Sequence, residues 1–365
     1  MSINEEEIHG GIDFQELNRL GIDPKSILDF SSNILTCPPS PRVKEAIAGA
    51  EWNRYPDREC TYLRMALATH HQVDPELLLV GNGCSELIHL VAAELIQPGD
   101  RVVVLEPTFS EYRRAAHRAG ATVHNCALPI LESDDSRSNL GNTAVEEQER
   151  VLRVLDRYKP HLFWFCNPNN PTGSYTDVGI LRKWIDANPG TLFVIDESYL
   201  DFVAGGESLI GLACQNLIVL RSMTKLYGLA GLRLGYLYTN PASLKRLKRR
   251  RIPWSVNAFA LEAGTAAIQD HLYYLQQRTQ RLRDLSQLVL GLKERGIQTI
   301  PTDTNYFLTR IGNPDETYRF LLRNQILVRK CNSFGLSHFL RIAARHASQN
   351  ERFLEAIDRL EERTD

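Results

Sequence analysis

Short apolar runs alternate with longer amphipathic stretches over most of the chain. Each run has the length of a strand and is followed within two residues by glycine, proline or a polar residue, as in buried strands that lead into loops. Some segments before or between the runs are helix-like, for example 57–71 and 144–158. Strands that alternate with helices predict an α/β fold with a mostly parallel sheet. The strand-like runs are 76–80, 101–105, 161–165, 191–195 and 216–220.

The last third of the chain has a different rhythm. A long helical stretch is expected over roughly 256–294, and after it short strands alternate with helices expected at 314–323 and 347–363. The first 40 residues lack the pattern of a regular sheet. The predicted organisation is an N-terminal arm (1–40) that packs with the small domain, a large domain (41–255), and a linking helix followed by a small α/β domain (256–365).

Composition narrows the functional classes. The 365 residues leave room for two domains with ample cores, and the formal net charge of −2 gives no global field that favours nucleic acid or an anionic membrane. No apolar run reaches the length of a membrane span. The seven cysteines include no CxxC pair and the histidines no HExxH pair, so we expect free thiols in a cytoplasmic protein without a metal site.

The clearest candidate chemistry lies in residues 221–236, RSMTKLYGLAGLRLGY. Ser222 and Thr224 precede Lys225, and Arg233 follows it by eight residues in a glycine-rich segment. A lysine amine forms Schiff bases with carbonyls once burial or a nearby cation lowers its pKa. Hydroxyls and a guanidinium suit an anionic ligand beside that amine. The alternative interpretation is a strand followed by a loop with solvated basic residues.

Two further stretches favour the functional interpretation. CNPNNPTG (166–173) follows a strand-like run, and its prolines and asparagines indicate a rigid turn. In TLFVIDESYLDF (191–202) the strand ends in Asp196, with Tyr199 three residues later. A carboxylate at the carboxyl end of a buried parallel strand lies where open α/β sheets bind ligands. A site for pyridoxal 5′-phosphate (PLP) needs a Schiff-base lysine, an acid for the pyridine nitrogen, donors for the ring oxygen and a phosphate cradle.

Three motifs in this order resemble those of the fold-type I PLP enzymes of the aminotransferase superfamily, in the branch that holds histidinol-phosphate aminotransferase. They are NNPTG, D-x-x-Y, and S-x-x-K with an arginine eight residues further on. The resemblance covers nearly the whole chain. It implies a seven-stranded, mostly parallel sheet in the large domain, a small mixed α/β domain, PLP as cofactor, and a homodimer. Within the branch the chain resembles the threonine-phosphate decarboxylases of cobalamin biosynthesis most closely, through HGG (9–11), DFSSNI (29–34), RYPD (54–57), PWSVNA (253–258) and LVRKCNSFG…FLRIAAR.

The resemblance implies a role for each cofactor-binding candidate. Lys225 would carry the Schiff base and move protons, and Asp196 would pair with the pyridine nitrogen. The free amides of a helix start, opened by GNGCSE (81–86), would bind the cofactor phosphate, so that Cys84 acts through its backbone. The other implied contacts are Asn170 and Tyr199 at the ring oxygen, Gly83, Ser222, Thr224 and Arg233 at the phosphate, Phe109 on the ring face, and Tyr55 at the phosphate in the partner subunit.

The same resemblance implies a set of substrate contacts. Arg341 would bind the substrate's α-carboxylate, Arg329 and His9 its phosphate, and Asn33 and Asn170 would lie beside it. From the residues alone, the favoured interpretation of His9 is a loop histidine, and the alternative for the two arginines is a role in edge-strand salt bridges. Phe109 as a core aromatic and Tyr55 as a turn tyrosine are the corresponding alternatives for the cofactor set.

The narrower match implies decarboxylation of L-threonine O-3-phosphate to (R)-1-amino-2-propanol O-2-phosphate. A histidinol-phosphate-type aminotransferase that uses 2-oxoglutarate would share every cofactor contact, because the two reactions differ in which Cα bond stands perpendicular to the PLP ring. The chain also departs from the decarboxylase pattern at Ile12 and over 35–41. A non-catalytic PLP-sensing module is a third alternative, which the lysine of S-x-x-K disfavours.

Overall fold

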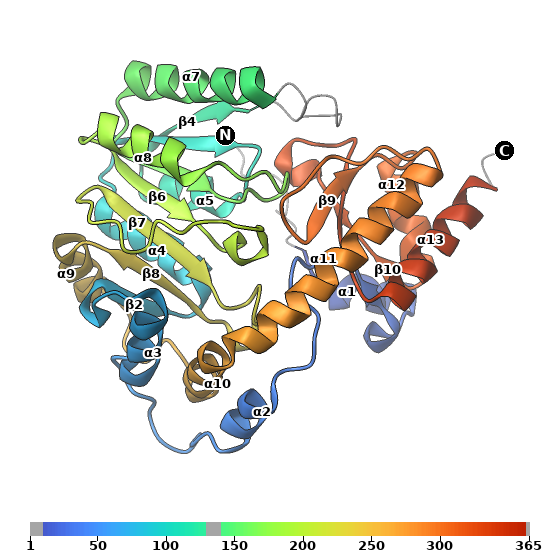
Figure 1. Cartoon of the computed structure of the whole chain (residues 1–365), viewed down its shortest axis with the longest axis horizontal. Helices are drawn as coiled ribbons and strands as arrows, with labels where there is room; N and C mark the ends of the chain where they lie inside the picture. Colours follow the sequence, from blue (N-terminus) through green and yellow to red (C-terminus); the bar gives the residue numbers. More distant parts are fainter. Residues whose placement is uncertain (1–9, 129–139, 363–365) are drawn as a thin grey trace.

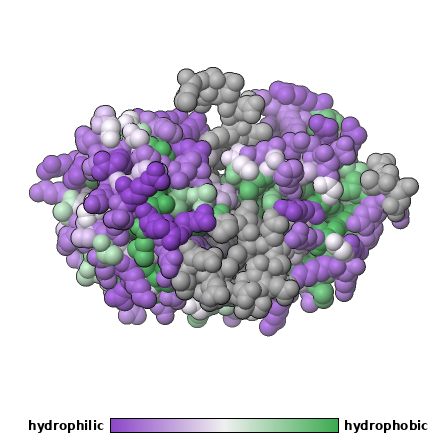
Figure 2. All heavy atoms as spheres, turned by 90° about the horizontal axis from the view of Figure 1, so that it is seen from above, coloured by the Kyte–Doolittle hydropathy of each residue, from purple (hydrophilic) through white to green (hydrophobic). Residues whose placement is uncertain are grey.

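The computed structural model describes residues 10–128 and 140–362. A large sheet with helices on both faces lies beside a smaller α/β unit, and a long helix, α11 (His271–Glu294), runs from one toward the other (Figure 1). Seen from above, this face of the molecule is mostly hydrophilic, with hydrophobic residues confined to smaller areas (Figure 2).

The large sheet has seven strands in the order β2-β8-β7-β6-β5-β3-β4. All neighbours are parallel except β8, which is antiparallel to both β2 and β7. This confirms the predicted mostly parallel sheet. The strands are β2 (Leu78–Gly81), β3 (Arg101–Glu106), β4 (Thr122–Ala127), β5 (Leu162–Cys166), β6 (Leu192–Asp196), β7 (Leu217–Ser222) and β8 (Gly235–Thr239).

Helices cover this sheet because alternate strand residues point to opposite faces and both faces are apolar. In β3, for example, Val103 packs in one core cluster with α7 and α8, whereas Val102 packs in another with α4 and α5. The helices of this part are α2 (Pro41–Ala48), α3 (Thr61–His71), α4 (Gly83–Leu95), α5 (Glu111–Arg118), α7 (Leu140–Tyr158), α8 (Val178–Ala187), α9 (Pro241–Arg250) and α10 (Ala258–Gln269).

The smaller unit is built on a three-stranded antiparallel sheet in the order β11-β12-β9. Its core cluster includes Phe30 from the N-terminal arm, which packs against Phe353 with ring centroids 5.1 Å apart. The elements are β9 (Tyr306–Thr309), β11 (Arg329–Lys330), β12 (Leu340–Ala343), α12 (Pro314–Arg323) and α13 (Ala347–Glu361). The helix expected at 314–323 is confirmed. The domain boundaries at 40 and 255 stay predictions.

Two sequence expectations were wrong. Residues 1–40 do contribute to a sheet, since β1 (Leu28–Asp29) pairs in parallel with β10 (Ile326–Leu327). The single helix expected over 256–294 is two helices separated at Asp270, whose backbone leaves the helical conformation at φ −99°, ψ 24°. Asp270 also pairs with Arg42 on α2 at 3.1 Å, and α10 contacts α2 and α3 while α11 contacts α13. The break at Asp270 therefore lets α10 pack against α2 and α3 while α11 packs against α13.

Short elements complete the described chain. The helix α1 (Phe14–Leu20) is capped by the Asp13 side chain and ends at Gly21, which has a left-handed C-cap conformation with φ 65°. No helix in the described ranges is long and apolar enough to cross a membrane. All seven cysteines are free thiols. The 3₁₀ helices are η1 (Pro24–Ser26), η2 (Pro75–Leu77), η3 (Leu200–Phe202), η4 (Ala230–Leu232) and η5 (Asn332–Phe334).

Candidate active site

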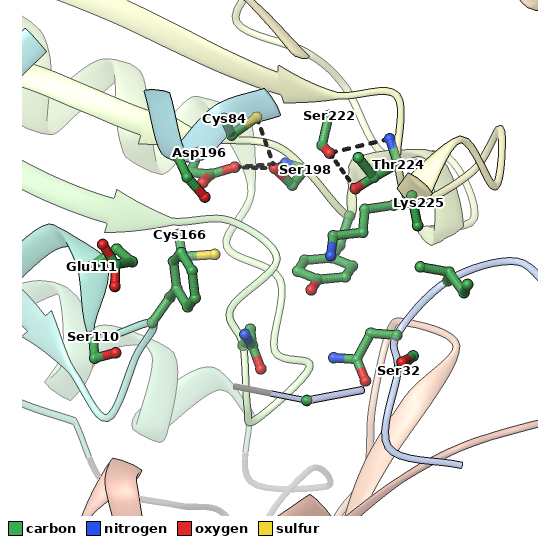
Figure 3. A pocket seen from close by; sticks show the side chains of 18 of the residues that line it. Ser32, Cys84, Ser110, Glu111, Cys166, Asp196, Ser198, Ser222, Thr224 and Lys225 are labelled. Atoms are coloured by element: carbon green, nitrogen blue, oxygen red, sulfur yellow. Dashed lines mark hydrogen bonds between the residues drawn. The ribbon is translucent and has the colours of Figure 1, made fainter. Parts of the chain in front are cut away.

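A cavity of about 490 Å³ lies at the carboxyl ends of β5, β6 and β7. This is the edge at which open α/β sheets bind ligands. Residues of the N-terminal arm and of the small antiparallel sheet close its other side. Figure 3 shows Lys225, Ser222, Thr224, Asp196, Ser198 and Cys84 directed to this space, with Ser32 of the arm across from them. Of the predicted site residues in the described chain, all but Gly83 and Tyr55 line the cavity.

Lys225 lies three residues after the end of β7 and extends its amine into the cavity (Figure 3). Its Nζ lies 5.2 Å from the centroid of the Tyr199 ring. Its backbone carbonyl accepts a hydrogen bond of 2.9 Å from the amide of Leu35, so the arm and the lysine loop are joined beside the site. The lysine is half-buried, which places its amine within reach of a ligand in the cavity.

An anion cradle lies near Lys225. The first amides of α4 have no partner within the helix, and the hydroxyls of Ser222 and Thr224 are 2.7 Å apart beside them. Gly83 has φ +77°, and a Cβ at this position would approach Nη2 of Arg233 to 2.9 Å. The glycine therefore allows the guanidinium of Arg233 to lie over the helix start. Amides, two hydroxyls and a guanidinium together match the needs of a phosphate group.

Asp196 ends β6 as a carboxylate that is only 4% exposed. The Ser198 amide donates to Oδ1 at 2.9 Å, the Ser198 hydroxyl donates to the same oxygen, and the Tyr112 hydroxyl donates to Oδ2 at 2.8 Å. Burial raises the pKa of Asp196, while the donors from Ser198 and Tyr112 and the charge of Lys225 act in the opposite direction. A cationic ring nitrogen beside this carboxylate would stabilise its charged form.

Sequence reasoning missed Tyr112 and Ser198. Tyr112 is buried on α5 and stacks on Trp164, so it has the features of an ordinary core residue. Ser198 occupies one of the unspecified positions in D-x-x-Y. A serine two residues after an aspartate at a strand end is the one local signal that could have indicated the hydrogen bond between them.

The asparagine turn after β5 positions Asn170. The Asn169 side chain accepts from the Thr108 hydroxyl at 2.7 Å and donates to the Pro107 carbonyl at 2.8 Å, while its backbone carbonyl accepts from Tyr306 at 2.8 Å. The Asn170 side chain accepts a hydrogen bond from Nη1 of Arg341. The turn therefore connects the end of β5 to the arginine of the small sheet. The peptide bonds that precede both prolines of this turn are cis.

Arg329 and Arg341 stand opposite each other in the antiparallel pair β11–β12. Both are buried. Arg329 donates to the Ser333 hydroxyl and Arg341 to the Ser31 carbonyl, each at 2.7 Å. Within the described chain, Nε of each lacks a partner. Burial, and after it the charge of Arg341, lowers the pKa of Arg329 to about 10. Opposed like charges in a buried site are unfavourable unless an anion joins them, so the pair favours an anionic ligand.

Asn33 also lines the cavity and has polar side-chain atoms without a hydrogen-bond partner among the described residues. It is 3% exposed, and neither polar atom of its side chain has a partner in the part of the chain that the structure describes. Buried amides are almost always hydrogen-bonded, so this one favours a ligand in the cavity. His9 lies outside the described residues. Its neighbour Gly10 lines the cavity, and a Cβ on Gly10 would approach Nη2 of Arg341 to 3.1 Å.

The remaining candidates have different surroundings. Phe109 lines the cavity, and its ring centroid is 5.7 Å from that of Tyr112. Tyr55 lies away from the cavity, is 80% exposed, and packs against Trp254 with ring centroids 4.9 Å apart. Burial raises the pKa of the Cys84 thiol to about 12, so the side chain is not a reactive thiolate.

The cavity fits PLP. It brings an amine, a buried carboxylate and an anion cradle to separate points of one space, and Gly83 leaves room where a Cβ would meet the guanidinium of the cradle. Lys225, Asp196, and the group formed by Ser222, Thr224 and the start of α4 are the parts that would hold it.

Comparisons with known proteins agree with this geometry. The model of the family "Aminotransferase class I and II" matches residues 25–357. A histidinol-phosphate aminotransferase of Moorella thermoacetica is 33% identical over 357 residues, covering 95% of this chain and 88% of that protein. A threonine-phosphate decarboxylase of Salmonella typhimurium is 36% identical over 362 residues, covering 96% and 95%.

Solved structures are similar over the whole fold. The crystal structure of L-threonine-O-3-phosphate decarboxylase from Porphyromonas gingivalis has a TM-score of 0.76 at 25% identity and covers 91% of this chain and 99% of that chain. Histidinol-phosphate aminotransferase from Sinorhizobium meliloti, in complex with pyridoxal-5′-phosphate, has a TM-score of 0.83 at 22% identity and covers 96% and 95%.

Proposed function

Because the chain belongs to the class I and II aminotransferase family and is a PLP-dependent enzyme of fold type I, we propose that it decarboxylates L-threonine O-3-phosphate. The product would be (R)-1-amino-2-propanol O-2-phosphate, an intermediate of cobalamin biosynthesis. The observation that carries the proposal is the buried pair Arg329 and Arg341, which are opposed across β11–β12 and line the same cavity as Lys225. The proposed substrate is a short amino acid with two anionic groups, a carboxylate and a phosphate, which two arginines suit.

The proposed cofactor contacts follow from the cavity. PLP, when bound, supplies an aldehyde that bonds to an amine and a protonated pyridine ring that withdraws electrons from the substrate's Cα. Lys225 would provide the amine that holds the cofactor and would move a proton at the substrate's Cα. Asp196 would hold the proton on the ring nitrogen. Asn170 and Tyr199 donate to the ring oxygen, and Phe109 covers the ring face.

The proposed phosphate contacts of the cofactor are electrostatic. The amides at the start of α4 and the hydroxyls of Ser222 and Thr224 donate to the phosphate oxygens, and Arg233 adds a planar guanidinium. These groups come from β7 and α4, two elements that are fixed in the large sheet and its cover. The cofactor phosphate would thereby be held by elements of the large sheet and of the helices that cover it.

The proposed substrate contacts decide which Cα bond breaks. Arg341 binds the α-carboxylate, and because Asn170 and the Ser31 carbonyl hold two of its nitrogens, the direction of the carboxylate is fixed. Arg329 binds the substrate phosphate, with His9 as the further contact implied by the motif HGG. Asn33 supplies a side-chain amide beside the substrate. In the proposed reaction these contacts would orient the α-carboxylate so that the bond from Cα to the carboxylate breaks and CO₂ leaves.

Release of CO₂ from O-phospho-L-threonine, by protein loaded with PLP and without 2-oxoglutarate, is the direct test. Sustained release over many turnovers is expected. A single turnover followed by arrest, or no release at all, would contradict the proposed reaction while leaving the cofactor contacts in place.

A histidinol-phosphate aminotransferase is the second candidate. The 33% identity to such an enzyme over 95% of the chain favours it, and so do the departures from the decarboxylase pattern at Ile12 and 35–41. The distinguishing measurement is conversion of histidinol phosphate that depends on 2-oxoglutarate. Activity in this assay without CO₂ release from phosphothreonine would assign the chain to the aminotransferases.

Replacing Asp196 with asparagine should have opposite effects on the protein with and without PLP. Burial raises the pKa of Asp196 in the folded protein. The contribution of this side chain to folding stability is therefore fully present below its ordinary pKa, where it is protonated in both states, and is lost as pH rises through the raised pKa. Without cofactor, Asp196→Asn should therefore be more stable near neutral pH, by about 1.4 kcal/mol for each unit of pKa shift. With cofactor, loss of the charged pair should weaken PLP binding roughly tenfold or more.

The measurements for Asp196→Asn are thermal unfolding of the cofactor-free protein across the acid range and a fluorescence titration with PLP. Ser198→Ala serves as the matched variant, because it removes one donor to the carboxylate and should move the pH dependence of unfolding upward. Identical pH profiles for the wild type and Asp196→Asn would show that this carboxylate does not have a raised pKa.

We further propose that the enzyme is a homodimer in which Tyr55 reaches the cofactor phosphate of the partner subunit. Tyr55 and Tyr62 line a common surface pocket, and Trp254 packs on Tyr55. Large exposed apolar side chains that gather in this way indicate an interface. Those near Tyr55 in the chain or in space are Trp52, Tyr62, Met65, Ile252 and Trp254.

Two substitutions should separate assembly from the contact of Tyr55. Trp254→Glu places a charge in the apolar surface and should shift the protein to monomers in sedimentation experiments, with weaker PLP binding. Tyr55→Phe should stay dimeric and weaken PLP binding about 2- to 12-fold, as expected for one lost hydrogen bond. Full PLP affinity in a monomeric Trp254→Glu variant would exclude a contact from the partner.

A further inference from the structure

Arg345 lies four residues after Arg341 and is only 3% exposed. Its guanidinium donates to three backbone carbonyls of the N-terminal arm, those of Asp29, Ser32 at 2.9 Å and Ile34 at 3.5 Å. These carbonyls lie 311 to 316 residues earlier in the chain. One buried side chain thus satisfies much of the backbone of residues 29–34, here called the arm segment.

The arm segment is a folded loop with few free groups. The Asp29 carboxylate accepts from the Ser31 amide at 2.8 Å and from the hydroxyls of Ser31 and Ser32 at 2.6 Å each. The Ser31 hydroxyl also accepts from the Gly11 amide at 2.9 Å. Backbone bonds of 2.8 Å join Phe30 to Leu327 and to Ala343 on the small unit. Asn33 projects from this loop to the cavity, and its side chain is the part without a described partner.

Burying the guanidinium of Arg345 costs more free energy than burying an apolar side chain, so packing alone does not explain an arginine at this position. A buried guanidinium loses its hydration, and an apolar side chain of similar volume would fill the same space without that loss. What an apolar side chain would lack is donors for three diverging carbonyls. Arg345 therefore specifies the path of the arm segment and not only its burial.

Strand β12 and the residues that follow it carry two arginines with complementary contacts, Arg341 within the strand and Arg345 two residues after its end. Arg341 faces the cavity and donates to the Ser31 carbonyl, whereas Arg345 donates to the carbonyls on either side of it. The arm segment and the arginine proposed to bind the carboxylate are consequently held as one unit. A displacement of the arm would move Asn33 and also release one of the two bonds that orient Arg341.

We propose that Arg345 is a positioning residue for the substrate site: it fixes the arm segment so that Asn33 and Arg341 meet the substrate, although Arg345 itself touches no ligand. The part concerning substrate rests on the proposed function. The part concerning the arm segment stands on the contacts of this chain alone.

The first test needs no substrate. Hydrogen exchange of the PLP-loaded protein should show faster exchange in Arg345→Gln at the amides of Phe30, Ser31 and Ser32, which are hydrogen-bonded in the wild type. Amides of the seven-stranded sheet should be unchanged. Arg345→Lys keeps the charge with fewer donors and should give an intermediate result. It also replaces Arg345→Gln if that variant does not fold. Wild-type exchange rates at the arm amides in both variants would overturn the proposal. If Arg345→Gln does not fold, wild-type exchange rates in Arg345→Lys would overturn it.

The second test uses O-phospho-L-threonine as the probe. Arg345→Gln should raise KM roughly tenfold or more, as for lost hydrogen bonds to a charged group, with little change in PLP affinity. In a double-mutant cycle with Asn33→Ala, the two effects should be less than additive, because Arg345 acts partly through Asn33. Additive effects, or an unchanged KM, would overturn the proposal.

Arg295→Gln is the matched control. It removes a guanidinium from the same unit. Arg295 pairs with Asp358 at 2.5 and 2.8 Å, and neither residue lines the cavity or is close in sequence to a residue that does. It should lower thermal stability without changing KM or exchange of the arm. If wild-type enzyme does not respond to O-phospho-L-threonine, the proposed function fails, and the exchange experiment still decides the role of Arg345.

Discussion

Replacing Lys225 with alanine should lower turnover by about 10⁴-fold, because the variant loses both the amine that bonds the cofactor and the group that moves a proton at Cα. Among the described residues that line the cavity, Lys225 is the one lysine. The amine lies over the Tyr199 ring at the end of β7, in a cavity otherwise supplied with amides, hydroxyls, arginines and carboxylates. The measurements are turnover and the visible absorbance of bound PLP after dialysis.

The controls for Lys225→Ala address folding and charge. Thermal unfolding and chain association should match those of the wild type, since the substitution removes a half-buried amine and leaves the apolar core unchanged. Lys225→Arg retains a cation that does not lose its proton near neutral pH and should be equally inactive. Turnover of Lys225→Ala at the wild-type rate would refute the central assignment.

Replacing Arg341 with glutamine should lower kcat/KM by roughly 30- to 4,000-fold, the range expected when one partner of a buried charged contact is removed. The loss should appear for every substrate that carries an α-carboxylate. Arg341 also donates to Asn170 and to the Ser31 carbonyl, so its removal leaves two acceptors without their donor. Steady-state kinetics with O-phospho-L-threonine provide the measurement.

Arg329→Gln is the matched control for Arg341→Gln, because the two arginines are paired in register on neighbouring strands. It should affect recognition of the phosphate and so reduce the preference for O-phospho-L-threonine over L-threonine, whereas Arg341→Gln should leave that ratio nearly unchanged. The same preference in both variants would mean that the arginines do not divide the two anionic groups between them.

The sequence was most informative where chemistry follows a long buried strand. Lys225 and Asp196 could be placed at the same sheet edge because parallel strands end on one side, and both line one cavity. The mostly parallel sheet could be predicted for the same reason. The edge strand β4 (Thr122–Ala127) could not, since all its residues except Cys126 are exposed or half-buried and its pattern is less apolar than that of its neighbours.

The features that sequence reasoning missed depend on contacts between distant segments. The pairing of β1 with β10 involves two residues from each strand, too few to produce a periodic pattern. Tyr112 has the spacing of a core residue, and only its position in space shows that its hydroxyl meets Asp196. Arg345 belongs to the motif FLRIAAR, yet nothing local indicates that its partners are carbonyls of the arm.

The junction of β1 with β10 has a consequence for synthesis of the chain. Phe30 is fully buried in a core whose other members include Phe307, Ile342 and Phe353. During translation the arm leaves the ribosome before the strands of the small unit, and its apolar residues stay without this core until that later part of the chain has emerged. The seven-stranded sheet has all its strands by Thr239 and needs no such delay. Nascent chains arrested before residue 326 should therefore hold a folded large sheet and an accessible arm, a stage at which a chaperone has an apolar segment to bind.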